Sequence, residues 1–281
     1  MTGVLRYSAF TTDPAGGNPA GVVLDTAGLD DAAMLRIAAE VGYSETAFAT
    51  PLDEPRHHAV RYFSPLAEVA FCGHATIATA VALAERDGDG RLSFHTPAGL
   101  VEVDTANGTA SLTSVAAHSS PAPPELVERA LAALRWDAAE LDPAFPPHVA
   151  FAGVRHLVLG AASRERLARL DYAFDELGDL MRAFELATVH LFWRGPGGEF
   201  HARDPFPVGG VVEDPATGAA AAAFGAYLRS IGALTPPARV LVHQGEDMGR
   251  PSLLTVDVPA SAPGVVVTGA AVPLPRSPGV R

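Results

Sequence analysis

RYFSPLAEVAFCGHAT, residues 61–76, is the stretch on which the fold of this chain depends. A short β-rich run carries it into a loop that ends at Gly73-His74, and an almost wholly apolar segment follows from Ala75 to Ala84. A helix that is apolar on every side belongs inside a protein, and about ten residues are too few to span a bilayer. We therefore predict a buried helix whose glycine-headed first turn offers backbone N–H groups to an anionic ligand.

A second copy of this pattern lies downstream. Residues 203–207 lead to a loop that ends at Thr217-Gly218, and residues 219–228 are again apolar. The flanking segments repeat in the same order: residues 151–159 match 10–24, 180–186 match 32–41, 189–192 match 45–48, and 240–257 match 94–104. We predict an α+β fold of two pseudo-symmetric halves, each a curled, mainly antiparallel, barrel-like sheet around its own central buried helix. The cleft between the halves is then expected to receive both helix starts and to hold the active site.

The sequence also predicts where the halves meet. Ser119-Ser120-Pro121-Ala122-Pro123-Pro124 has the composition of a linker. We therefore place an N-terminal half at residues 1–117 and a C-terminal half at 118–281, with the linker near 117–124. Residues 273–281 are expected to form a flexible tail.

Composition excludes several classes of function. The net charge of −12 argues against binding to nucleic acid or to an anionic membrane surface. Lysine is absent, so neither a lysine Schiff base, as pyridoxal phosphate needs, nor a Walker-type phosphate loop can form. A single cysteine excludes an internal disulfide, and the first residues lack the pattern of an export signal. We expect a cytoplasmic protein.

Glu45 is the leading candidate for catalysis. It lies between Ser44 and Thr46 before an apolar strand, at a place where the second half has an apolar residue. A carboxylate held in an apolar cleft is harder to ionise, which suits proton abstraction beside a carbonyl. The alternative is a half-exposed strand residue with its carboxylate in water. His74 and Asp214 could face one ligand from opposite sides, but they could also be a structural histidine and a helix-capping or turn residue.

Other polar residues receive structural interpretations. Glu213 is expected to be a solvated neighbour, and His95 and His243 occupy matching repeat positions, which favours a structural role. No third metal ligand stands at useful spacing from His57-His58, so we expect no metal site there. The lone Cys72 excludes a mechanism with two thiols and is interpreted as a buried apolar residue.

The motifs together resemble those of the PhzF-like isomerases of phenazine biosynthesis. The matching segments cover nearly the whole chain: Gly17-Asn18-Pro19, Ser44-Glu45-Thr46, Cys72-Gly73-His74-Ala75-Thr76, Gly153-Val154-Arg155-His156, residues 213–218 and residues 244–251. The resemblance implies the two-half fold of diaminopimelate epimerase and acid–base isomerisation without a cofactor or a metal. It also implies a small carboxylated substrate, such as an unsaturated cyclic acid, and, as in many members, a homodimer.

The resemblance assigns roles to individual residues. The residue matching Glu45 moves the proton, and those matching His74 and Asp214 bind and polarise the substrate. Contacts to the substrate are expected from Asn18, Ser44, Gly73, Thr217, Gly218 and Ala219.

One position departs from the family. Ala219 stands where the family usually has serine, and a lost hydrogen bond of this kind costs about 0.5–1.5 kcal/mol. The substrate is therefore expected to differ from the phenazine precursor. Two alternatives stay open: another metabolite-directed enzyme on the same scaffold, such as a hydrolase or lyase, and a non-catalytic ligand-binding protein.

Overall fold

The computed structural model describes residues 3–275, and the chain divides into two compact units. Unit 1 runs to Thr113 and takes up the chain again from Thr268, whereas unit 2 comprises Ser114–Val267. The sequence places the boundary four residues later and assigns the last strand to the second half. In the structure that strand returns to pair with the first strand of unit 1, because an open sheet there would leave an unpaired edge. The predicted tail, 273–281, falls mostly outside the described residues.

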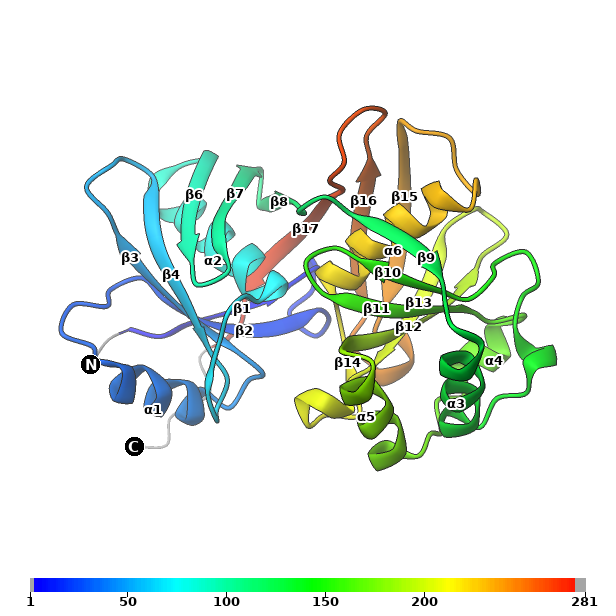
Figure 1. Ribbon diagram of the computed structural model, residues 1–281. Helices are drawn as coiled ribbons and strands as arrows, with labels where there is room; N and C mark the ends of the chain where they lie inside the picture. The colour runs from blue at the N-terminus through cyan, green and yellow to red at the C-terminus, as the bar shows by residue number, and fades with distance from the viewer. Residues whose placement is uncertain (1–2, 276–281) are drawn as a thin grey trace. The chain divides into compact units, whose positions relative to one another are not determined.

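In its described part, unit 1 contains two helices and a set of strands (Figure 1). Its elements are β1 (Leu5–Ala9), β2 (Asn18–Val23), α1 (Asp31–Val41), β3 (Thr46–Pro51), β4 (His57–Phe63), β5 (Glu68–Val69), α2 (Gly73–Asp87), β6 (Gly90–Thr96), β7 (Gly99–Ala106), β8 (Thr109–Thr113) and β17 (Val266–Pro273).

The strands of unit 1 close into a barrel around α2. The pairings run β1–β2–β3–β4–β6–β7–β8–β17 and return to β1. Helix α2 packs against β1, β2, β3, β7 and β8, and every residue from His74 to Leu83 is buried. The prediction of a glycine-headed, buried helix is confirmed over residues 74–83, and the last turn of α2 reaches the surface. Small side chains explain how the strands approach it on all sides, since alanine and threonine dominate its sequence.

Helix α1 lies against β3 and β4 and fixes the segment that carries Glu45. Its N-cap is Asp30, whose carboxylate accepts a hydrogen bond from Ala33 N at 2.8 Å. Met34 and Ala38 on its inner face pack in one apolar cluster with Phe48 and other barrel residues. The helix ends at Gly42 in the left-handed region, so the chain turns directly into β3.

Unit 2 repeats this arrangement around α6. Its strands pair in the order β9–β10–β11–β12–β13–β15–β16, and α6 contacts both β9 and β16, so the sheet curls around the helix. Its elements are β9 (His118–Pro121), α3 (Pro124–Leu134), η1 (Ala138–Glu140), β10 (His148–Phe151), β11 (Arg155–Gly160), α4 (Arg164–Ala168), α5 (Phe174–Ala183), β12 (Leu186–Arg194), β13 (Phe200–Pro205), η2 (Pro207–Gly209), β14 (Glu213–Asp214), α6 (Gly218–Ser230), β15 (Ala238–Gln244), η3 (Glu246–Met248) and β16 (Ser252–Val258).

The predicted repeat is confirmed strand by strand. In unit 1, β2 runs parallel to β3 and β4 parallel to β6, whereas the pairs β1–β2, β1–β17, β3–β4, β4–β5, β6–β7 and β7–β8 are antiparallel. Unit 2 has parallel pairs at the matching places, β11 with β12 and β13 with β15. One boundary differs: α5 ends at Ala183, and Leu186 already belongs to β12.

The interpretation of 117–124 as a linker is wrong. Residues His118–Pro121 form β9, which pairs antiparallel with β10, and Pro124 begins α3. Proline cannot donate a ladder hydrogen bond, but it is tolerated on an outer strand and at the first position of a helix. The proline-rich composition therefore marked a strand end and a helix start, both inside unit 2.

Candidate active site

Glu45 is held at the junction between α1 and β3. Its backbone carbonyl accepts a hydrogen bond from Gly21 N at 3.2 Å, which ties this junction to β2. Its side chain is 16% exposed, so the carboxylate is neither free in solvent nor sealed in the core. The interpretation of Glu45 as a solvated strand residue therefore fails, since the residue precedes the strand and its side chain is largely covered.

Cys72 and His74 come from the start of α2. Cys72 is the N-cap residue, and no side chain caps this end of the helix by a hydrogen bond. The Cys72 carbonyl accepts from Thr76 N at 3.0 Å and from Thr76 Oγ1 at 2.7 Å. Thr76 Oγ1 is in turn 2.7 Å from the buried Tyr62 hydroxyl. The barrel strand β4 thereby fixes the loop from which both side chains project.

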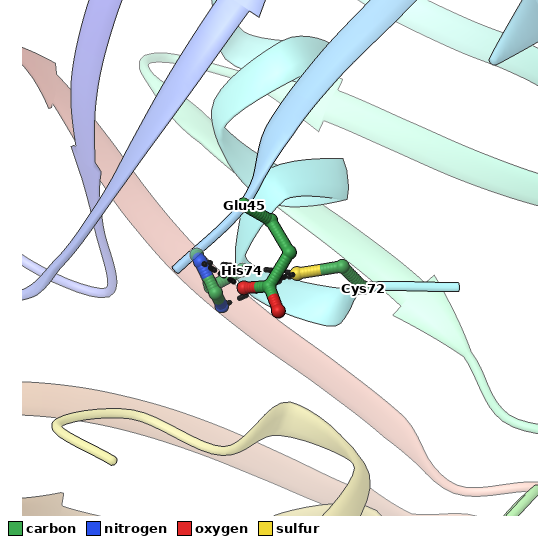
Figure 2. A group of neighbouring side chains, drawn as sticks. All are labelled: Glu45, Cys72 and His74. Atoms are coloured by element: carbon green, nitrogen blue, oxygen red, sulfur yellow. Dashed lines mark hydrogen bonds and ion pairs between the residues drawn. The ribbon is translucent and has the colours of Figure 1, made fainter. Parts of the chain in front are cut away.

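The three side chains converge on one point, as Figure 2 shows. His74 Nε2 lies 3.4 Å from Glu45 Oε2, and Cys72 Sγ lies 3.5 Å from the same oxygen and 3.4 Å from His74 Nδ1. Burial lowers the pKa of His74, an effect that the Glu45 carboxylate partly offsets. A neutral imidazole at this place can orient and polarise a ligand by hydrogen bonding without adding a second buried charge.

The interpretation of Cys72 as a simple apolar residue is corrected here. Its burial is as expected, at 8% exposure, but its sulfur contacts a carboxylate and an imidazole. The signal was present in the sequence, because Cys72 directly precedes Gly73-His74 at the helix start. What the sequence could not supply was the approach of Glu45, which comes from a different element of the barrel.

The remaining predicted contacts of unit 1 lie at strand and helix starts. Ser44 Oγ is 3.4 Å from His74 Nε2, so this residue belongs to the same cluster. Gly73 is the first residue of α2. Asn18 is buried at the first position of β2, opposite Ala9 of β1.

In unit 2, Asp214 and Thr217 form a hydrogen-bonded loop ahead of α6. Thr217 Oγ1 donates to Asp214 Oδ2 at 2.6 Å. The buried Gln244 side chain spans this loop: its Nε2 donates to Asp214 O at 2.8 Å and to Thr217 Oγ1 at 3.0 Å, and its Oε1 accepts from Thr217 N at 3.1 Å. Gly218 and Ala219 open the helix, with Gly218 buried and Ala219 partly exposed.

Glu213 is not the solvated neighbour that the sequence predicts. It is 6% exposed and forms a two-pronged ion pair with Arg203, with one contact at 2.9 Å between Arg203 Nε and Glu213 Oε1. Arg203 also donates to the Ala168 carbonyl at 2.6 Å. A buried carboxylate needs such a partner, and Arg203 supplies it from the neighbouring strand β13.

The other histidines stand apart from these groups. His57 Nδ1 is 3.1 Å from His95 Nε2, and His243 stacks on His201 with ring centroids 5.2 Å apart. Within residues 3–275, Glu45, Cys72 and His74 are the side chains whose ligand atoms lie close enough together to hold a metal ion.

Comparison with known proteins places this chain in a family. The family model described as "Phenazine biosynthesis-like protein" matches residues 7–276. The chain belongs to this family. An uncharacterized isomerase of Mesorhizobium japonicum is 34% identical, with 90% of this chain and 89% of that protein covered. Trans-2,3-dihydro-3-hydroxyanthranilate isomerase of Pseudomonas fluorescens is 32% identical, with the same shares covered.

Solved structures agree on the fold. A phenazine biosynthesis protein of the PhzF family from Bacillus anthracis superposes with a TM-score of 0.87 at 26% identity, covering 97% of this chain and 96% of that one. A hydroxyproline epimerase from Agrobacterium vitis has a TM-score of 0.67 at 15% identity, covering 97% and 90%, which shows a shared fold only. The predicted epimerase-like, two-half α+β fold is confirmed, and the chain is an isomerase. None of the helices among the described residues has the length and apolar character to cross a membrane.

Proposed function

We propose that this isomerase moves a hydrogen within a small carboxylated substrate by acid–base chemistry, with Glu45 as the group that carries the proton. The observation behind the proposal is the partly covered Glu45 carboxylate beside the buried His74 ring, at a distance of 3.4 Å. A carboxylate that is shielded from water, yet open enough to meet a ligand, is suited to take a proton from carbon and return it.

The proposed step balances without a redox change. The Glu45 carboxylate accepts a proton from one carbon of the substrate, and the C–H electron pair shifts into the adjacent unsaturated system. The carboxyl group, whose proton can exchange with water, then gives a proton to a second carbon. His74 polarises a polar substituent of the substrate. Ser44 helps to orient the His74 imidazole, since its Oγ lies 3.4 Å from His74 Nε2. The backbone N–H groups at the start of α2, from Gly73 onward, are placed to bind the substrate carboxylate.

Asp214, Thr217, Gly218 and Ala219 have a proposed share in substrate binding. The hydrogen bonds of the Gln244 side chain fix the Asp214–Thr217 loop, which supports a defined binding surface at the start of α6. That both helix starts bind one ligand stays a prediction. If both bind the same ligand, Asp214→Asn should raise KM for the substrate on which Glu45 acts. Measuring kcat and KM separately for Asp214→Asn and for Glu45→Gln tests this expectation.

The name of one relative supports a proposal for the substrate class. The Pseudomonas fluorescens relative acts, by its name, on a hydroxylated dihydroanthranilate, which is an unsaturated cyclic carboxylate. We propose a substrate of this class for the present chain, altered at the group that Ala219 would face, since alanine offers no hydroxyl. Reaction without a cofactor, a cytoplasmic location and a homodimer stay predictions from the sequence.

Solvent exchange tests the role of Glu45. The enzyme is incubated in heavy water with a panel of unsaturated cyclic acids, and deuterium incorporation is followed by NMR and mass spectrometry. Glu45→Gln is expected to lower exchange by at least about 100-fold while the fold is kept, because proton transfer by a side chain typically contributes that much. Glu40→Gln, an exposed glutamate on α1, is the matched control and should exchange like the wild type. Equal exchange in the Glu45 variant would refute the role, and a cleaved product would identify a lyase or hydrolase instead.

A further inference from the structure

The position of Cys72 is unexplained by the acid–base step. Its sulfur lies between the carboxylate and the imidazole that carry the proposed chemistry, at 3.5 Å and 3.4 Å. We propose that Glu45, Cys72 and His74 bind one Zn²⁺ ion, and that the bound ion inhibits the isomerase by occupying the Glu45 carboxylate. The inhibition, though not the binding, rests on the proposed function.

The geometry of the three ligand atoms supports the site. Bonds of about 2.3 Å to sulfur and about 2.0–2.2 Å to nitrogen and oxygen put the ligands of a tetrahedral Zn²⁺ about 3.6 Å apart when sulfur is one of the pair, and about 3.4 Å apart otherwise. In the structure, Sγ–Nε2 is 3.8 Å, Sγ–Oε2 is 3.5 Å and Nε2–Oε2 is 3.4 Å. An ion therefore fits above this triangle with side-chain adjustments of a few tenths of an ångström.

The chemistry of the donors selects the metal. A thiolate with an imidazole favours Zn²⁺ over Mg²⁺ or Ca²⁺, which prefer oxygen ligands. The thiolate and carboxylate together balance the charge of a divalent ion. Cys72 is the N-cap residue of α2, so a metal-bound thiolate would lie at the positive end of the helix. Three protein ligands leave the fourth position to water. The ion occupies the Glu45 carboxylate that the proposed step needs to accept a proton, so the zinc-bound protein is expected to be inactive.

A pair of exposed histidines on the same unit provides the control. His57 Nδ1 and His95 Nε2 are 3.1 Å apart in an exposed setting, and exposed histidine pairs also bind zinc. This pair lacks sulfur. A readout specific for metal–thiolate bonds therefore distinguishes the two sites, and His95→Ala removes the surface pair without touching the cluster.

The experiment titrates the metal-free protein with Co²⁺ and then displaces it with Zn²⁺. We expect a sulfur-to-cobalt charge-transfer band and visible bands of four-coordinate Co²⁺, which saturate at one ion per chain and disappear as Zn²⁺ is added. Cys72→Ser should remove the charge-transfer band and weaken Zn²⁺ binding by more than about 100-fold, since outer-shell changes alone cost about 10–100-fold. His74→Gln should weaken binding similarly. This variant serves as the second test if Cys72→Ser does not fold, and circular dichroism checks that His74→Gln itself is folded. His95→Ala should leave the band and the affinity unchanged.

The outcomes separate the site from the function. No thiolate band, or a band whose affinity follows His95 and not Cys72, would overturn the zinc site. Zinc binding at Cys72 without loss of solvent exchange would overturn the inhibition alone. Exchange that survives Glu45→Gln would overturn the proposed acid–base role, and the cobalt spectrum would still report the site.

Discussion

The Gln244 side chain offers a sharp test of how the α6 loop is held in place. Gln244 is 1% exposed and makes three hydrogen bonds to the Asp214–Thr217 loop, at 2.8, 3.0 and 3.1 Å. Gln244→Met keeps the volume of the side chain but removes every donor and acceptor. Each bond contributes about 1 kcal/mol, so we expect a loss of about 3 kcal/mol in the free energy of unfolding of unit 2.

This loss is large enough to measure in two ways. For a unit of about 150–250 residues, about 3 kcal/mol corresponds to a fall of about 6–12 °C in Tm. Urea titration gives the free energy directly, and an unchanged m-value would show that the unfolded state is not altered. Thr96→Val is the control, since it removes one exposed hydrogen bond, from Thr96 Oγ1 to Gly99 O at 2.8 Å, that water can replace. If the free energy of unfolding of Gln244→Met lies within about 1 kcal/mol of the wild-type value, the Gln244 side chain does not hold the loop in place.

Three further predictions concern buried charge, protonation and backbone geometry. Arg203→Met leaves the Glu213 carboxylate buried without its partner and should cost about 3–5 kcal/mol in urea unfolding, whereas the double change with Glu213→Met should cost less. Burial lowers the pKa of His156 from 6.5 to about 4. As the pH falls from 6.5 to about 4, His156 therefore becomes protonated in the unfolded chain but stays neutral in the folded one. The free energy of unfolding should therefore fall by up to about 3 kcal/mol across this range and level off below it, and His156→Asn should flatten the profile. Gly17→Ala should destabilise unit 1 by about 1–3 kcal/mol, because φ is +70° and the new Cβ would meet Ala9 O. Gly28→Ala, at φ +76° but with open space around the new Cβ, is the control and should lower the temperature of thermal unfolding less.

The repeat was predictable because it has a signature in the sequence. An apolar segment behind a glycine, flanked by strand patterns in a fixed order, appears twice, and burial of the segment from His74 to Leu83 follows directly from its composition. The return of β17 to unit 1 was not predictable in the same way, since it depends on which unpaired edge the last strand reaches.

Local composition misled where tertiary partners decide the outcome. The serines and prolines at 119–124 look like a linker, but pairing with β10 makes a strand of the first part. Glu213 looks solvated until Arg203, ten residues earlier in the chain, is brought beside it. Cys72 looks apolar because nothing near it in the sequence reveals that Glu45 approaches its sulfur. In each case the decisive neighbour comes from another element.

The comparison of the two helix starts shows where the units have diverged. Both begin with a glycine after a loop, Gly73 in α2 and Gly218 in α6, and both helices are buried in a curled sheet. The shared features are those that the scaffold needs. The residues that differ include those proposed to act on the substrate. Cys72 and His74 in unit 1 contact a carboxylate, whereas Thr217 in unit 2 belongs to a loop fixed by the neutral Gln244 amide, and Ala219 follows in the first turn of α6. One helix start therefore gathers a carboxylate, a thiol and an imidazole. The loop before the other helix is held by hydrogen bonds from neutral side chains around Asp214, next to the Glu213 carboxylate that Arg203 pairs.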